Sequence, residues 1–188
     1  MKTVRVRTWA RFVAEVERFS RTYSAVTRTL AEGETYTIKN RVLFRGQADA
    51  SWDLATTLER RSATPFTIER YIEKALSAKN ELETFTGQRW PVPQGDKLQR
   101  ELSNDLHKAF ADLPGYEYLV YLRHHGYPSP LLDWTESPYI AAYFALSENT
   151  RKSSAIYCYV ERPQGSKGGV VGQPEIHVRG PLVTSHRR

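Results

Sequence analysis

One segment in the second half of the chain constrains the fold most, because it holds two helix boundaries with a polar loop between them. A short helix over residues 116–123 is stopped by Gly126, and Ser137 with Pro138 supplies the cap and first residue of the next helix. The intervening loop carries histidines and a run of hydrogen-bonding side chains. Binding and catalytic residues are found disproportionately on loops held by rigid elements, so a functional site is expected here.

A second informative stretch is an apolar strand that ends in a cation and a glycine. Residues 42–44 are Val-Leu-Phe and are followed by Arg45 and Gly46. A guanidinium at a strand end can hold a phosphate or carboxylate at two points, and Gly46 would permit close approach of a ligand or an unusual backbone angle. The alternative is a structural ion pair of the arginine with a nearby carboxylate, and the candidates are Asp49, Asp53 and Asp133.

Apolar periodicity and turn chemistry predict the other elements. Helices are expected over about 9–20 (capped by Thr8), from Thr64-Pro65 towards residue 82, and from 98 to before Pro114. Strands are expected over 36–44, with a bulge or turn at residues 39–40, over 155–160, and near 170–171 and 176–178. Helices dominate the middle and strands lie towards both sides, which favours α+β over regular βαβ alternation.

Length and composition bound the class of protein. The chain has 188 residues, which favours one domain, and a net charge of +6, which fits either an anionic partner or a solvated basic surface. The single cysteine, Cys158, excludes an internal disulfide and a cysteine zinc cluster, and no histidine spacing indicates a metal site. The N-terminal residues lack a signal-peptide core and no apolar run approaches eighteen residues. A cytoplasmic protein with no membrane partner and no metal is expected.

Two adjacent histidines end the first helix of the polar segment. His124 and His125 point about 100° apart on a helix, so both are not expected to face one site. Either imidazole could transfer a proton. The alternative is that they bond the last helix carbonyls.

The loop residues 133–137 divide by expected role. Ser137 is explained as a helix cap, Asp133 as a buried acceptor for loop amides or for Arg45, and Trp134 as core or as a stacking wall. Thr135 and Glu136 have no obvious capping duty. These two are therefore the better candidates for ligand contact.

The two segments together resemble the FRG domain family, which is named for its Phe-Arg-Gly motif. The motif stands here at residues 44–46, continued by Gln47-Ala48-Asp49, and the second family block matches residues 124–145. His125 replaces the usual Tyr, Ser129 the usual Thr and Pro130 the usual Arg; the last change removes a cation near the site. The family is largely bacterial and phage-associated. The resemblance implies one domain over 1–188, with an N-terminal helical segment (1–30), a motif-bearing core (36–160) and a C-terminal strand or tail (161–188) that leaves the domain incomplete.

A weaker likeness runs from this family to ADP-ribosyltransferases. It implies a helical middle packed on a mixed or antiparallel sheet, with NAD as cofactor and its phosphates held by Arg45. A Ser/Thr position, Thr135 or Ser137, would shape the nicotinamide pocket, and a late glutamate (Glu161 or Glu175, with Glu136 as fallback) would bond the ribose. The implied catalytic residues are Arg45, His124, Thr135 and Glu136. The implied cofactor-binding residues are Arg45, Gly46, Gln47, Asp133, Trp134 and Ser137.

Three functions remain open on this basis. The first is an ADP-ribosyltransferase-like enzyme of bacterial or phage conflict, a toxin or defence protein that modifies a protein or nucleic acid and is controlled by an antitoxin or regulatory protein. The second is a non-enzymatic module that binds nucleic acid or protein. The third is a metal-independent nuclease using His124 and Glu136, which lacks a second proton-transfer partner at clear spacing.

Overall fold

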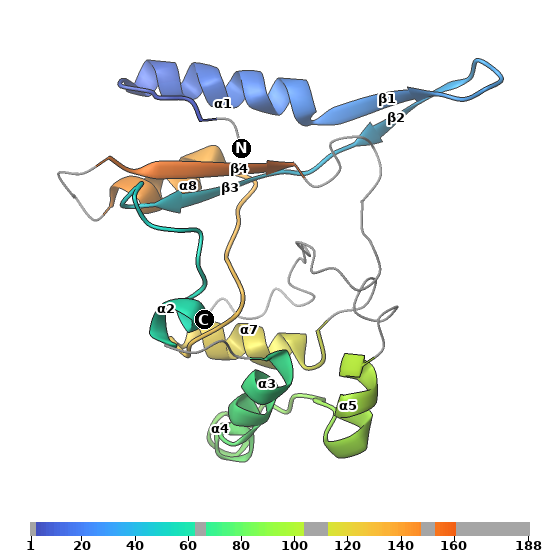
Figure 1. Ribbon diagram of the computed structural model, residues 1–188, viewed down its shortest axis with the longest axis vertical. Coiled ribbons are helices and arrows are strands. Elements are labelled where there is room, and N and C mark those ends of the chain that lie inside the picture. Colours follow the sequence, from blue (N-terminus) through green and yellow to red (C-terminus); the bar gives the residue numbers. More distant parts are fainter. Residues whose placement is uncertain (1–2, 63–66, 104–112, 148–152, 161–188) are drawn as a thin grey trace. The chain divides into compact units, whose positions relative to one another are not determined.

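The computed structural model describes residues 3–62, 67–103, 113–147 and 153–160 and has an α+β architecture (Figure 1), as predicted. Its strands form two small antiparallel sheets: β1 (Ala25–Thr29) with β2 (Thr35–Lys39), and β3 (Val42–Gln47) with β4 (Ala155–Val160). The described helices are α1 (Trp9–Tyr23), α2 (Thr57–Arg61), α3 (Ile68–Leu76), α4 (Lys79–Thr86), α5 (Gly95–Ser103), α7 (Tyr116–His124) and α8 (Pro138–Leu146). No helix in these ranges is long and apolar enough to cross a membrane.

The chain divides into two compact units. The strand unit holds the described residues up to Asp53 and from Asp133 to Val160, with both sheets, α1 and α8. The helical unit holds the described residues between Leu54 and Leu132, with α2, α3, α4, α5 and α7. The domain boundaries expected from the sequence stay a prediction.

Local sequence signals set the ends of the two helices in the strand unit. The Thr8 hydroxyl accepts a hydrogen bond from the Arg11 amide (3.2 Å) at the start of α1. The Ser137 hydroxyl accepts from the Ile140 amide (3.3 Å) at the start of α8, with Pro138 as its first residue. Both starts were predicted, and both caps satisfy amides that have no partner inside the helix.

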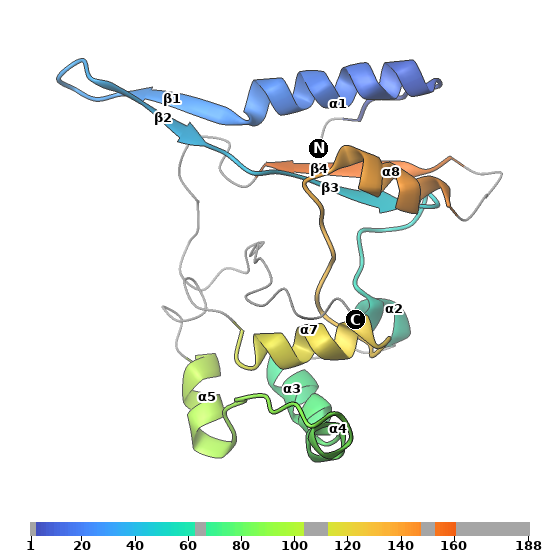
Figure 2. The ribbon, with the colours of Figure 1, turned by 180° about the vertical axis from the view of Figure 1, so that it is seen from behind.

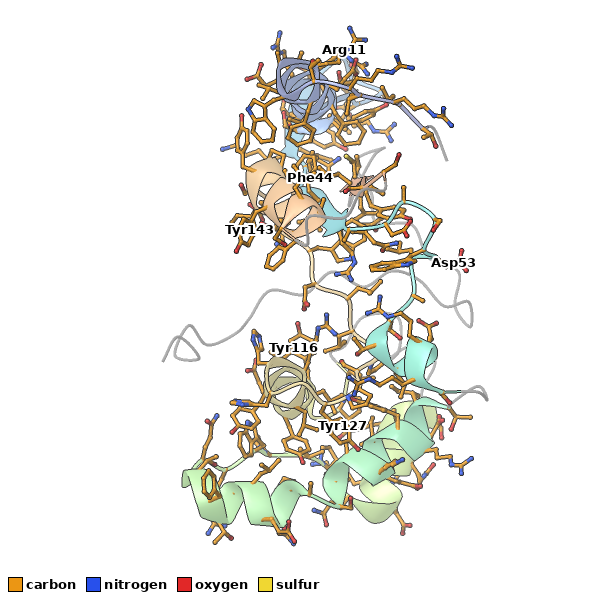
Figure 3. All side chains as sticks on the ribbon, turned by 90° about the vertical axis from the view of Figure 1, so that its left-hand side faces the viewer. Arg11, Phe44, Asp53, Tyr116, Tyr127 and Tyr143 are labelled. Atoms are coloured by element: carbon orange, nitrogen blue, oxygen red, sulfur yellow. The ribbon has the colours of Figure 1, made fainter. Side chains whose placement is uncertain are left out.

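The core of the strand unit lies where α1, α8 and β3 meet. Phe44 is buried there against Phe12 and Val16 of α1 and two alanines of α8. Figure 2 shows α8 lying along β3, and Figure 3 shows Phe44 beside α8 while Tyr143 projects from the opposite side of that helix. The small side chains of α8 bring its backbone close to the strand, and this proximity fixes where the polar loop before α8 can run.

The core of the helical unit is larger and mixed in character. Tyr71, Ile72 and Ala75 of α3 pack with Leu119 and Leu122 of α7. Trp90 and Tyr118 complete this core. The Trp90 ring lies 4.6 Å from the Tyr121 ring, centroid to centroid, at a tilt of 47°, and the Tyr118 hydroxyl donates to the Ala75 carbonyl oxygen at 2.7 Å.

Three features of the helices and strands differ from the sequence-based expectations. The helix predicted from Thr64-Pro65 begins instead at Ile68, with Thr67 as its cap, and the Ser77–Ala78 turn separates it from α4. The segment expected as a strand over 36–44, with a bulge or turn at residues 39–40, takes the turn form as two short strands, β2 and β3, whereas the additional strand β1, which pairs with β2, was not expected. Residues 63–66, the part of the predicted 98–113 helix over residues 104–112, and the strands predicted near 170–171 and 176–178 lie outside the described residues.

Candidate functional site

The two sequence motifs meet in the strand unit. Phe44 and Thr135 exchange both backbone hydrogen bonds of an antiparallel bridge, at 2.7 and 2.9 Å. One residue further along β3, the Nη1 atom of Arg45 donates to the backbone carbonyl oxygen of Asp133 at 2.8 Å. The arginine of the first motif is therefore attached directly to the polar loop of the second. Asp133 is exposed, so the prediction that it is buried is wrong, and its backbone carbonyl oxygen is an acceptor for Arg45.

Two tyrosines of β4 lie on the same face of the sheet as Arg45. The register of β3 with β4 sets Arg45 opposite Tyr157 and Leu43 opposite Tyr159, and directly paired residues share one face. The Trp134 ring lies 6.0 Å from the Tyr159 ring, centroid to centroid. Reasoning from the sequence missed both tyrosines, although their two-residue spacing in a predicted strand was a signal that they lie on one face.

Within the loop, the two residues expected to be available for a ligand have structural partners. The Thr135 hydroxyl oxygen accepts a hydrogen bond from the Ser137 amide at 3.1 Å. The Glu136 carboxylate forms an ion pair with Arg41, whose Nε and Nη2 both lie 3.0 Å from Oε1. Both members of this pair are well exposed, at 44% for Arg41 and 67% for Glu136, so the pair is screened by solvent.

The turn after β3 is held by side chains of the first motif. The Gln47 amide is buried and donates to the Trp52 carbonyl oxygen at 2.8 Å. The Asp49 carboxylate accepts from both the amide (2.9 Å) and the hydroxyl (2.6 Å) of Ser51, which closes an Asx turn. The Tyr157 hydroxyl lies 3.4 Å from the same Trp52 carbonyl. These bonds hold the chain at the end of β3 beside Arg45.

Gly46 has a packing role that the sequence did not indicate. A β-carbon at this position would lie 1.8 Å from the Ala141 carbonyl oxygen and 2.8 Å from the Ala145 amide nitrogen, both backbone atoms of α8. The space that a side chain would need is thus occupied by the helix. The sequence led us to expect a ligand close to Gly46, but in the structure the backbone of α8 lies close to it. Contact of Gly46 with a cofactor stays a prediction.

The predicted proton-transfer residue belongs to the other unit. His124 is the exposed last residue of α7, and the His125 amide donates to the carbonyl oxygens of Tyr121 and Leu122 (both 3.2 Å) as the helix ends. The His125 ring lies 4.3 Å from the Tyr121 ring. The structure therefore places Arg45 with residues 133–137. His124 lies in the helical unit, and its role in proton transfer stays a prediction.

The charges of the described residues are nearly balanced. These residues include eighteen basic and sixteen acidic side chains, so most of the net charge of +6 lies elsewhere in the chain. Although Cys158 is exposed, the protein around its sulfur raises the pKa of the thiol to about 11, so it is protonated at neutral pH and is a poor nucleophile. Within the described ranges, no group of three or more potential ligand residues is arranged to hold a metal ion.

The architecture is thus that of an α+β protein whose two motif blocks meet at one strand end. A family model described as "FRG domain" matches residues 40–154, which is more than half of the chain and includes both blocks. The chain belongs to the FRG domain family. No curated protein and no solved structure matches it.

Proposed function

We propose that this FRG-domain protein is an ADP-ribosyltransferase-like enzyme of bacterial or phage conflict that uses NAD to modify a macromolecule. The observation that carries the proposal is the junction of Arg45 with the loop 133–137, through the Asp133 carbonyl and the Phe44–Thr135 bridge. This junction holds the Arg45 guanidinium, which is suited to bind phosphate, next to a loop rich in hydrogen-bonding groups. The likeness of an aromatic-Arg-Gly strand end to ADP-ribosyltransferases adds an analogy.

Binding of NAD would use the chemistry present at this strand end. The Arg45 guanidinium is planar and has five N–H donors, a geometry that suits two oxygens of a pyrophosphate. The Tyr159 side chain lies on the same face of the sheet as Arg45, and the ring of the loop residue Trp134 lies 6.0 Å from it, so the two rings offer faces on which a nicotinamide or adenine ring can stack. Gln47 and Ser137, which hold the turn and the helix start, would keep this surface rigid.

Transfer of ADP-ribose would break the bond between nicotinamide and ribose. The electron pair of that bond leaves with nicotinamide, positive charge develops on the ribose, and an acceptor nucleophile then bonds to the same carbon. A carboxylate beside the ribose stabilises the developing charge, and in the described loop that group is Glu136. Release of Glu136 from Arg41 would cost at most about 1 kcal/mol, because the pair is exposed.

The other predicted residues have subsidiary roles in this proposal. Thr135 would line the nicotinamide pocket, and His124 would orient the acceptor or exchange a proton with it. Glu161 and Glu175, the alternative carboxylates, lie outside the described residues.

Calorimetric titration with NAD tests the proposal on four proteins side by side. Wild type should bind, Arg45→Ala should lose binding, and Arg45→Lys should bind weakly, because a lysine keeps the charge but not the two-point geometry. Arg18→Ala is the matched control: Arg18 is an exposed arginine of α1 that pairs with Glu15, and its removal should leave binding unchanged. Unchanged binding in a folded Arg45→Ala, or no binding by a folded wild type, would refute the proposal.

A protein-binding module is the second candidate, and one observation favours it. Helix α8 carries no charged residue, and its Tyr143, Phe144 and Leu146 side chains are 60–68% exposed. Apolar patches of this kind commonly mark interaction surfaces. A folded wild type that ignores NAD but loses a partner on Tyr143→Ser would support this function.

A further inference from the structure

The helical unit has a cavity of about 710 Å³, open to solvent, that the proposed function does not use. One wall is a single face of α4, where Glu81, Leu82 and Phe85 follow one another at helical spacing. The other wall is the end of α7 with the chain that follows it, including Tyr121 and Tyr127. This volume is in the range of small-molecule sites, and it lies within one unit.

The helix that forms the first wall is held in place from its other side. Lys79 and Glu83 form an ion pair at 2.7 Å with side chains only 10% and 15% exposed, and Glu83 also accepts from the Trp90 amide at 2.8 Å. The Lys79 pair lies within α4 and holds the Glu83 side chain in place, and the bond from the Trp90 amide ties this face of the helix to the chain that follows it. The face that carries Glu81 and Phe85 is thereby kept turned towards the cavity in the absence of a ligand.

The lining has the composition of a cation site. The Phe85 side chain is 89% exposed, so most of its apolar surface is left in contact with water. With Tyr127 it gives two aromatic rings whose faces attract cations. The Tyr121 ring forms the wall behind them and is held between Trp90 (4.6 Å) and His125 (4.3 Å), the second of which also lines the cavity, while Tyr127 has a ring contact with Tyr71 at 6.4 Å. Figure 3 shows Tyr127 on the side of α7 towards α3.

The same lining contains one carboxylate, and it is uncommitted. Among the described residues, Glu81 makes no hydrogen bond and no ion pair, in contrast to Glu83 two positions later. A carboxylate beside aromatic rings in a mainly apolar cavity attracts a positively charged ligand and disfavours a negatively charged one. Its long-range attraction is weaker in salt.

We propose that this cavity binds an organic cation of the quaternary or N-methylated ammonium class. The aromatic rings surround the methyl groups and Glu81 balances the charge. The proposal is independent of NAD binding, because it uses no residue of the strand unit.

The test uses the full chain and a matched pair of probes. Choline and its neutral isostere 3,3-dimethyl-1-butanol have the same shape and differ in charge. Each is titrated while the amide resonances of Gly126 and Tyr127 are followed by NMR. Choline is expected to give saturable shifts and to bind about two- to five-fold more tightly than the alcohol, in line with one exposed cation–π site.

Variants separate the cation site from a generic apolar cavity. Glu81→Gln should reduce the preference for choline while the alcohol binds as before, and Phe85→Ala should weaken choline without unfolding the chain, because Phe85 is exposed. Glu73→Gln, a change at an exposed α3 carboxylate outside the lining, is the control and should change nothing. Equal affinity for the two probes would overturn the proposal, as would a choline preference that is as large in Glu81→Gln as in wild type, or the lack of any saturable shift.

Discussion

Replacing Gly46 with alanine is expected to destabilise the protein strongly, because the new methyl group would meet the backbone of α8. The added carbon would lie 1.8 Å from the Ala141 carbonyl oxygen, whereas ordinary contacts need about 3.5 Å. Backbone atoms cannot rotate away, so α8 would have to move from β3 by roughly 1.5 Å. Overpacking costs about 1–3 kcal/mol, and a backbone clash in the core around Phe44 places this variant near the upper end, at about 3 kcal/mol.

Urea unfolding followed by circular dichroism measures this cost. With a slope of about 2 kcal/mol per M, the midpoint should fall by roughly 1.5 M. Gly33→Asn is the control, because Gly33 has a φ of 84° with no atom within 4 Å of an added β-carbon, and asparagine tolerates that backbone conformation. The control should cost less than about 1 kcal/mol. A free energy of unfolding for Gly46→Ala within about 0.5 kcal/mol of the wild-type value would refute the packing argument. If this stable variant also lost NAD binding, Gly46 would instead be needed for the close approach of the ligand.

Three further perturbations follow from the described contacts. Tyr118→Phe should lower the free energy of unfolding by about 1–3 kcal/mol, since it leaves the buried Ala75 carbonyl without its donor; urea unfolding checks this. The hydrogen bond from Lys79 lowers the pKa of Glu83. The ionised Glu83 side chain therefore stabilises the protein above the ordinary glutamate range, and this stabilisation is lost as pH falls through the lowered pKa. The difference in free energy of unfolding between wild type and Glu83→Gln should accordingly shrink from pH 6 to pH 3. Glu136→Gln should change stability by less than about 1 kcal/mol, because it breaks only an exposed ion pair, so any loss of activity in this variant would be a catalytic effect.

Sequence reasoning worked best where a short local signal fixes the structure. The Thr8 cap and the Ser137-Pro138 start each place a helix end through bonds spanning three residues. Both strands flanking the site, β3 and β4, were predicted from their apolar and β-branched content. Such features need no knowledge of the rest of the fold.

Elements with weak or competing signals were missed. Strand β1 is polar and largely exposed, so it has little apolar alternation. Helix α2 has only five residues, although Thr56 and Glu59 form a capping box that could have indicated it. At the start of α3, Thr64-Pro65 gave a stronger cap signal than Thr67, the residue that accepts the Arg70 amide.

One contact within the candidate site was predictable from the sequence, and its other contacts were not. That Arg45 meets the loop 133–137 was expected from the paired motifs, and the described bond to the Asp133 carbonyl confirms it. The role of Gly46 depends on the backbone of Ala141, and the Glu136 ion pair depends on Arg41; both partners lie about 95 positions away in the chain. Such distant contacts leave no trace in local spacing, so only the fold reveals them.

Phosphorus NMR of NAD tests the central claim, that Arg45 holds the pyrophosphate, most directly. The two pyrophosphate resonances should shift and broaden when wild-type protein is added, and should stay at their free positions with folded Arg45→Ala. Arg18→Ala, which changes an exposed arginine of α1, should behave as wild type. Pyrophosphate resonances that respond equally to wild type and Arg45→Ala would contradict the account, because the phosphates would then be held by other groups.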